Sequence, residues 1–468
     1  MVRTKRVPVV RPVATARRSF ASTSADVLTF VVAVGGSFVL KVGGDLPVAD
    51  VLLVPLLPIL IVLKPQRLQR ARLKNIFVLL AVWLLGEIIA DVYRGSDLQD
   101  WLRVDSRIFF IAANILCLAV LVGKNMRRHY LFLAGYGIGS VLSIRLQPNG
   151  YNDLWKFGYA SGVTTLVVLL SCYFYKRRNF PVVILILLGI AGVHLGFDFR
   201  SPVLFLLITI VLVTPVIPEK IGNLRILPSG NSKGRVLVLA VLALAAGGAA
   251  GKLVTFLSTE GVLGESARIK NEVESRSKGG ILLGGRPEVL VSSRAFLEMP
   301  FIGHGAWARD MKYVEMNHDL QVEWGMSDDK DFREEDLSGL IPTHSHLMDA
   351  LVDAGILGAG FWCYVLYLIA KGLFSAALNR PPLAPIYIYS LILFFWNVLF
   401  SPAGGINILP EAFMLIVVLD LLTATNLPKP KVLVPLRTRQ FRRWQQDRRA
   451  ISLFEGRRSK GTPSLGTS

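Results

Sequence analysis

The chain has 468 residues, of which 52% are hydrophobic and only 18% charged, and it carries a formal net charge of +19. Its mean hydropathy is +0.50. This apolar content recurs in runs of about 20 residues, the length that crosses a bilayer, which excludes a soluble globular protein. The three cysteines lie inside apolar runs, so we expect packing residues rather than disulfides. The predicted fold is all-α and polytopic.

About twelve hydrophobic spans are predicted along the chain. They cover residues 26–44, 47–63, 75–94, 106–123, 129–147, 157–175, 180–197, 201–217, 235–256, 346–370, 384–401 and 407–424. The domains that follow are a basic N-terminus (1–25), a first transmembrane bundle (26–256), a large loop (257–345), the last spans (346–424) and a basic tail (425–468). Small residues precede the first apolar run rather than follow it, so we expect the first span to remain uncleaved.

Lysine and arginine are concentrated in alternate loops, and short loops rich in these residues stay in the cytoplasm. The basic segments include 3–18, 64–72, 124–128, 176–178 and 220–235. This pattern predicts that both termini are cytoplasmic and that the large loop is extracytoplasmic. The basic cytoplasmic loops, and a tail attracted to anionic membrane lipids, account for the net positive charge. No nucleic-acid partner is therefore expected.

Ionisable residues within the spans gather towards the extracytoplasmic ends. Such residues are costly in a bilayer, so their position indicates a functional cavity more reliably than a loop charge does. We infer a polar cavity that opens outward, although each residue taken alone also fits an ordinary position at a span end. The set comprises Lys41, Glu87, Asp91, Asp105, Arg107, Arg145, Asp198, Arg200, Asp349, Asp353 and Glu411.

The middle of the large loop carries a helix signal at Pro287, because proline suits the first helical position. The pairs Val289–Leu290 and Phe296–Leu297 recur at a seven-residue offset, which predicts a helix lying on the bilayer or on the other spans. Arg286 would then stand at a helix N-terminus, where an anion such as a phosphate is favoured. The alternative is an ordinary surface arginine beside a capped helix.

The large loop ends immediately before a span. Thr343 is the expected N-cap, which places His344 in the first helical turn, where the positive helix end keeps an imidazole neutral. A neutral histidine can accept a proton; the alternative is an interfacial histidine. His346, Asp349 and Asp353 share the other helical face, but this spacing is a weak metal signal and no metal is expected.

Three segments carry a family pattern in the same order. They are DFRSPVL at residues 198–204, GRPEV at 285–289 followed by PFIGHG at 300–305, and HS at 344–345 followed by GILG at 355–358. Together, over roughly residues 195–370, they resemble the O-antigen ligase and polysaccharide polymerase superfamily of bacterial membrane proteins. Departures such as Phe199 in place of a serine, and His304 between the loop glycines, leave the subtype open.

The resemblance implies an inverting glycosyltransferase with a GT-C-like membrane fold. It would transfer a glycan from undecaprenyl diphosphate to a saccharide acceptor, a lipid A core or a growing polysaccharide, at the periplasmic face of the inner membrane. Arg200 and Arg286 would bind the diphosphate, and His344 would accept the proton of the attacking hydroxyl or orient that hydroxyl, without a metal or other cofactor. Arg294, His304 and His346 are secondary candidates.

Two other classes of protein fit part of the sequence. A transporter of glycans or other solutes would carry charges or Gly/Pro breaks near the bilayer midplane and internal repeats, and neither is conspicuous. A non-catalytic membrane scaffold would leave Arg200, Arg286 and His344 replaceable. Replacement of His344 therefore distinguishes an enzyme from a scaffold, whereas acceptor choice decides between ligase and polymerase.

Overall fold

A computed structural model describes residues 20–424, apart from 43, 64–70, 148–152, 215–231, 263, 266–267, 270, 273–285, 327–337 and 403. One structural unit spans Met1–Leu422, and Thr423–Ser468 form a second unit, of which only the first two residues are described. The expected basic segments up to residue 19 and from residue 425 therefore lie outside the described residues, as does an acidic stretch of the large loop.

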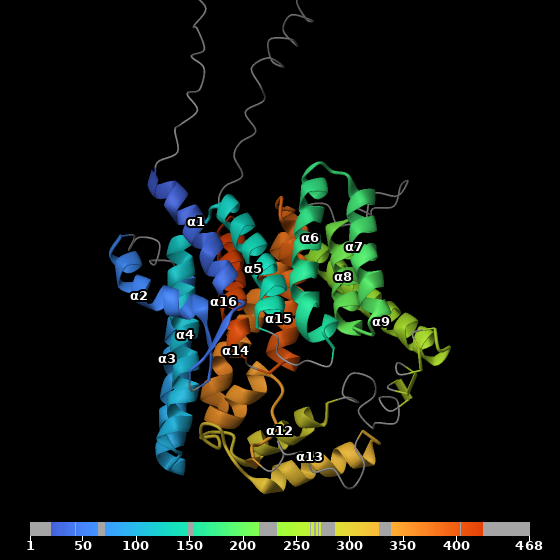
Figure 1. The fold of residues 1–468 in the computed structure, drawn as a ribbon. Helices are drawn as coiled ribbons and strands as arrows, with labels where there is room; N and C mark the ends of the chain where they lie inside the picture. The colour runs from blue at the N-terminus through green and yellow to red at the C-terminus, as the bar shows by residue number, and fades with distance from the viewer. Residues whose placement is uncertain are drawn as a thin grey trace, which may run out of the picture. The chain divides into compact units, whose positions relative to one another are not determined.

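The described residues are mainly helical (Figure 1). Before the large loop the helices are α1 (Phe20–Gly35), α2 (Val48–Leu63), α3 (Ala71–Arg94), α4 (Leu98–Leu121), α5 (Met126–Leu146), the π-helix η2 (Trp155–Tyr159), α6 (Ala160–Lys176), α7 (Phe180–Gly196), α8 (Arg200–Val213) and α9 (Ser232–Thr259). Within and after the loop they are α12 (Pro287–Glu298), α13 (Met311–Glu323), α14 (His346–Asn379), α15 (Ala384–Phe400) and α16 (Gly405–Ala424).

Five helices are long and apolar enough to cross a membrane: Arg72–Arg94, Leu98–Leu121, Trp155–Lys176, His346–Asn379 and Gly405–Thr423. Large apolar side chains also face outward, such as Leu185, which is 70% exposed. The protein is thus a helical membrane protein, as the composition predicted. Each of the twelve predicted ranges overlaps a helix. The count of twelve spans stays a prediction, because helices such as α8, with 14 residues, are shorter than a bilayer core of about 30 Å requires.

The first predicted span is wrong over its second half. Helix α1 ends at Gly35, and strands β1 (Val39–Lys41) and β2 (Asp45–Pro47) form an antiparallel hairpin. Glycine loses the most backbone freedom in a helix, so the Gly35–Gly36 pair favours a helix end. Lys41 consequently lies on an exposed hairpin, 2.7 Å from the Asp45 carboxylate, and not at the end of a span.

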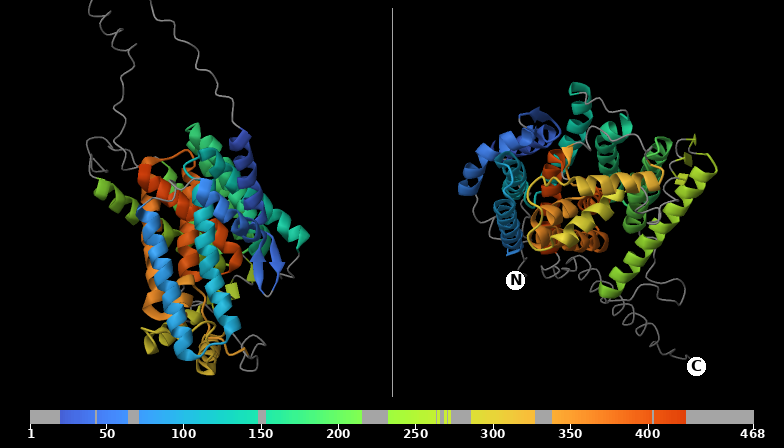
Figure 2. Two further views of the ribbon diagram at one scale, coloured as in Figure 1. Left: turned by 90° about the vertical axis from the view of Figure 1, so that its left-hand side faces the viewer. Right: turned by 90° about the horizontal axis from the view of Figure 1, so that it is seen from below.

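Helices α12 and α13 of the large loop lie at one end of the bundle, and the view from below shows them crossing that end (Figure 2). Pro287 is the first residue of α12 and Arg286 its N-cap, as predicted. The packing face was not predicted: Val291 and Ala295 are fully buried, whereas Leu297 is 68% exposed. Val291 and Ala295 are four residues apart, close to the helical repeat of 3.6, so they lie on one face of α12. Helix α12 packs against α13 and α14.

Helix α14 is broken at Gly355, whose φ of 61° and ψ of −147° lie outside the helical region. The positive φ is a conformation that glycine adopts without steric cost. At the break, the N–H of Ile356 donates to the carbonyl of Pro300 in the large loop, at 2.9 Å. The glycine of the GILG segment therefore opens the helix to receive the PFIGHG segment.

The PFIGHG segment completes this junction from the loop side. The N–H groups of His304 and Gly305 donate to the carbonyls of Val352 and Asp353 at 2.7 and 3.0 Å. Gly303 has a φ of +84°, and a Cβ at this position would collide with the Asp353 carbonyl. Two segments of the sequence pattern are thus joined by backbone hydrogen bonds, which fixes the large loop to α14.

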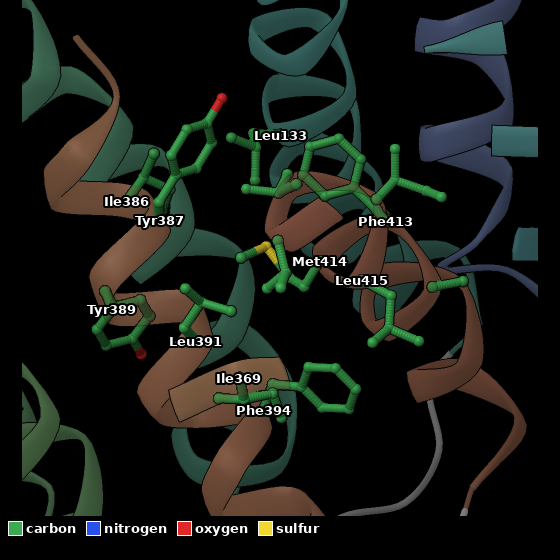
Figure 3. Close-up of a cluster of buried hydrophobic side chains, with 14 of the residues drawn as sticks. Leu133, Ile369, Ile386, Tyr387, Tyr389, Leu391, Phe394, Phe413, Met414 and Leu415 are labelled. Carbon is green, nitrogen blue, oxygen red and sulfur yellow. The ribbon is translucent and has the colours of Figure 1, made fainter. Parts of the chain in front are cut away.

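The hydrophobic core surrounds α14, α15 and α16. Tyr387, Leu391, Phe413 and Leu415 are almost fully buried, and Figure 3 shows side chains of this cluster packed together with Leu133 of α5. Helix α15 packs against α6, α8 and α14. It therefore connects helices that precede the large loop with those that follow it, and its C-terminal end is held between both groups.

Candidate functional site

A cavity of about 2200 Å³ lies among α5, α6, α8, α9, α15 and α16. Its wall is mostly apolar and includes Phe205, Phe394 and Phe413. A few polar residues interrupt this wall, many of them at the start of α8, the end of α15 and the start of α16. A large apolar cavity with a few convergent polar groups is typical of a ligand-binding site.

The three principal residues predicted from the sequence, Arg200, Arg286 and His344, all line this cavity. They come from three distant segments: the start of α8, the residue before α12, and the loop before α14. The fold therefore brings together side chains that were selected separately. Arg294 and His304 do not line the cavity.

Arg200 is the first residue of α8. Asp198, with a φ of 48°, turns the chain between α7 and α8. Nε of Arg200 donates to Oδ1 of Asp198 at 2.8 Å, and both residues line the cavity. The carboxylate orients a guanidinium at a helix N-terminus, where the helix dipole and the cation together favour an anion.

Arg286 is held by the C-terminal end of α15. Its Nη1 donates to the carbonyl of Phe400 at 2.5 Å, and its guanidinium lies 4.9 Å from the ring centre of Phe400 and 5.1 Å from that of Trp396. The negative end of a helix dipole and two aromatic faces each stabilise a cation. A permanent positive charge is therefore fixed in the cavity wall.

The expected N-cap of α14 was wrong by two residues. Ser345, not Thr343, is the N-cap, because its Oγ accepts a hydrogen bond from the N–H of Met348 at 3.1 Å. The Ser345 hydroxyl also donates to the carbonyl of Val398 at 2.9 Å, which fixes this choice through a tertiary contact. His344 consequently lies before the helix rather than in its first turn.

His344 keeps the expected neutral imidazole for a different physical reason. His344 is an exposed residue at the edge of the cavity, where partial loss of hydration lowers its pKa from the ordinary value of 6.5 and the nearby Arg286 guanidinium lowers it further. The carboxylate of Glu288 opposes this effect, since a negative charge favours the imidazolium. The ring therefore borders the cavity as a hydrogen-bond acceptor at neutral pH.

The last carbonyls of a helix lack partners within the helix, and those at the end of α15 accept hydrogen bonds from side chains of the site. Nδ1 of His346 lies 2.9 Å from the carbonyl of Ser401, to which it donates. On its other side, Nε2 of His346 lies 3.1 and 3.2 Å from the two carboxylate oxygens of Glu411. Glu411 lines the cavity, and Asn397 donates to its Oε1 at 3.3 Å. His346, a secondary candidate, thus supports a cavity residue from behind.

The other two secondary candidates stabilise the large loop. Nε of Arg294 lies 2.9 Å from Oε1 of Glu298 on the exposed side of α12. Nε2 of His304 lies 2.9 Å from the carbonyl of Ala295, its ring meets that of Tyr313 edge to face, and burial lowers its pKa. Neither geometry directs the side chain to the cavity.

The sequence pattern predicts that the eleven span-end charges share one outward-facing polar cavity. This prediction is wrong. Asp198, Arg200 and Glu411 line the cavity, but the others do not. Between α4 and α14, the Arg107 guanidinium lies 3.2 Å from Asp349 and 3.7 Å from Asp353. These residues belong to a separate buried group. Among the described residues, no group of three or more His, Cys, Asp or Glu side chains is arranged to hold a metal ion.

Several cavity residues were not selected from the sequence. Lys156 in η2, Lys252 in α9 and Asn397 in α15 are polar residues within apolar stretches, which is the signal that could have identified them. His194 in α7 also lines the cavity, where Nδ1 accepts from Nε1 of Trp155 at 3.2 Å. A lone histidine in an apolar run has no paired signal, so sequence alone could not assign it.

The fold and this site define a helical membrane protein with a large, mostly apolar cavity that carries two arginines, a neutral histidine and a buried glutamate in its wall. No protein-family model matches the chain, and no curated protein matches it. The geometry of the site and the resemblance of the three sequence segments are therefore the observations that point to a function.

Proposed function

We propose that the protein is a membrane glycosyltransferase of the O-antigen ligase or polysaccharide polymerase type. It transfers a glycan from undecaprenyl diphosphate to a saccharide acceptor, without a metal or other cofactor. The observation that carries the proposal is that Arg200, Arg286 and His344, taken from three separate sequence segments, line one cavity. The mostly apolar wall also suits a long polyprenyl chain, because lipid tails and apolar side chains are similarly apolar and the chain can pass from the bilayer into the cavity without losing hydrogen bonds.

In this reaction the acceptor oxygen forms a bond to the anomeric carbon, and the bond from that carbon to the diphosphate oxygen breaks with inversion. The electron pair leaves with the diphosphate, where negative charge grows. Arg200 and Arg286 stabilise that charge, because guanidinium groups bind phosphate oxygens in pairs and stay ionised. Fixed donors aimed at developing charge are often the largest contribution to catalysis.

The acceptor hydroxyl must lose its proton during the transfer. His344 borders the same cavity as the arginines, and partial desolvation there lowers its pKa, which favours the neutral imidazole. It accepts the proton or orients the hydroxyl. With the orientation indicated by the basic loops, α12 and this end of the cavity lie on the periplasmic side of the inner membrane, where undecaprenyl-linked glycans are used.

The test replaces His344 with alanine at normal expression in the native host. Surface glycans and undecaprenyl-linked intermediates are then analysed, with His304→Ala as the matched control, since this histidine of the same loop lies away from the cavity. Loss of long chains with single repeats still on the surface identifies a polymerase. Accumulation of full-length lipid-linked chains identifies a ligase. Normal glycans in the His344→Ala strain contradict the proposal.

A further inference from the structure

Glu411 is a buried carboxylate that the proposed reaction does not yet use. Its residue surface is only 7% exposed, yet it forms part of the cavity wall. It follows Pro410, which lies inside α16 and has no N–H to donate to the carbonyl of Ile406 one turn earlier. Ile406 and Pro410 also line the cavity, so the start of α16 presents a locally polar backbone there.

The hydrogen bonds around His346 determine how many protons the pair carries. Ser401 offers His346 a carbonyl, which can only accept, so Nδ1 must hold a proton. Nε2 faces both carboxylate oxygens of Glu411, which requires one more proton between the two groups. The pair is then an imidazolium beside a carboxylate, or an equivalent neutral pair. Either way, His346 fixes the position of Glu411.

Glu411 still has acceptor capacity that can face the cavity. A carboxylate has about four lone-pair sites. The donors found among the described residues are Nε2 of His346, which both oxygens share, and Nδ2 of Asn397, which reaches Oε1. Asn397 and Ser401 line the cavity beside it and add an amide and a hydroxyl. Carboxylate, amide and hydroxyl groups together suit a ligand rich in hydroxyl groups.

The position of this group next to Arg286 separates two kinds of ligand. Arg286 and His346 bind the consecutive carbonyls of Phe400 and Ser401, so a cation and a carboxylate are neighbours in one wall. A carboxylate repels a diphosphate but accepts hydrogen bonds from neutral hydroxyls, whereas a guanidinium has the opposite preference. An acceptor hydroxyl held by Glu411 would thus lie close to a diphosphate held by Arg286.

We propose that Glu411 is the acceptor-binding residue of this cavity and that it binds hydroxyl groups of the saccharide that receives the glycan. His346 is its positioning residue: the imidazole bridges the carbonyl of Ser401 and the carboxylate of Glu411, and so holds that carboxylate at the cavity wall. This inference rests on the proposed glycosyltransferase function and adds the site for the second substrate. It assigns two neighbouring parts of one wall to the two substrates.

The experiment uses the full-length protein in phospholipid nanodiscs. Binding of undecaprenyl diphosphate is measured directly, and transfer is measured with lipid-linked glycan and envelope saccharide extracted from the native host. Glu411→Gln is expected to raise the KM for the acceptor about 10- to 100-fold, as loss of a hydrogen bond to a charged group does. Binding of undecaprenyl diphosphate should stay within twofold of the wild type. Glu411→Asp, which keeps the charge, should recover part of the loss.

His346→Gln tests the positioning role. It should raise the acceptor KM less than Glu411→Gln does, and the double variant should be no worse than Glu411→Gln, because both changes act through one carboxylate. An unchanged acceptor KM in Glu411→Gln overturns the inference and leaves the proposed function intact. Joint loss of thermal stability and undecaprenyl diphosphate binding assigns Glu411 a structural role and also overturns it. A wild-type protein that neither binds undecaprenyl diphosphate nor transfers glycan contradicts the proposed function itself.

Discussion

Two groups of charged residues stand out in the structure, and the span-end charges selected from the sequence contribute to both. Around Arg107, the carboxylates of Asp349 and Asp353 are paired and largely buried between helices. Around Arg286, charges border a cavity of about 2200 Å³. Both groups contain close polar contacts, so what differs is access for a ligand. A charged residue within a span can therefore have a structural or a functional role. The presence of a cavity beside it indicates the functional one.

The loop contacts explain why the first group is closed. Oδ1 of Asp91 in α3 accepts a hydrogen bond from the N–H of Ala306 at 2.6 Å, immediately after the PFIGHG segment. That segment is inserted at the Gly355 break, so the loop covers α3 and α14 together. We therefore expect substitutions near Arg107 to lower stability, and substitutions in the cavity wall to lower activity.

The largest effect is expected for Arg286. Arg286→Ala should lower the rate of glycan transfer about 10²- to 10³-fold, as removal of one preorganised donor to a developing anion does. The rate of the Arg286→Lys variant should lie between those of the wild type and Arg286→Ala, because an ammonium keeps the charge but not the paired donors. Initial rates with an undecaprenyl-linked donor provide the measurement. Arg294→Ala, in the helix that follows Arg286 but away from the cavity, is the control and should stay within twofold.

The second effect concerns stability at the closed group. Arg107→Leu leaves Asp349 and Asp353 buried without their cation, which should lower the free energy of unfolding by about 3–5 kcal/mol. Arg103→Leu is the control, because Arg103 is more exposed than Arg107 and Asp100 keeps a second cation, Arg309, at 2.8 Å, so the loss should cost less than about 1 kcal/mol. Denaturation in detergent micelles measures both. A stable but inactive Arg107→Leu protein would show that the closed group is functional.

Local signals located the helices, and the three segments that carry the resemblance contain Arg200, Arg286 and His344, which line one cavity. The roles of these three residues stay predictions. Apolar runs located the helices, and Pro287 placed Arg286 at the start of α12. The failures depend on contacts between distant segments. Ser345 became the N-cap while its hydroxyl reached Val398, and the supporting role of His346 required Glu411, 65 residues further along the chain. No local pattern contains such partners.

The third effect isolates the junction between the loop and α14. Gly303→Ala should destabilise the protein by about 1–3 kcal/mol, because the residue has a φ of +84° and the new Cβ would meet the Asp353 carbonyl. Gly261→Ala is matched, with a φ of +73° but open space around it, so it should show the backbone strain alone. Hydrogen exchange at the Ile356 amide reports the junction. Equal effects of the two changes would mean that the close approach contributes nothing.

The smallest effect is a shift in the pH dependence of transfer. Partial desolvation disfavours the imidazolium of His344 and lowers its pKa below the ordinary 6.5. The neutral form therefore persists to lower pH, and the acid limb of the rate should lie below that value. The Glu288 carboxylate raises this pKa, so Glu288→Gln should move the acid limb further down, by less than about one pH unit. Glu315→Gln, on the exposed side of α13, should not move it.

This last measurement separates the two roles of His344. If His344 accepts the proton, the acid limb follows its pKa and moves with Glu288→Gln. His344 could instead only orient the acceptor hydroxyl while Glu411 binds that hydroxyl. In that case the imidazolium can still donate a hydrogen bond, so the rate should fall only slightly along the acid limb. An upward movement in Glu288→Gln would contradict both, since removing a negative charge cannot favour the protonated ring. The cavity wall would then need a different proton acceptor beside Arg286.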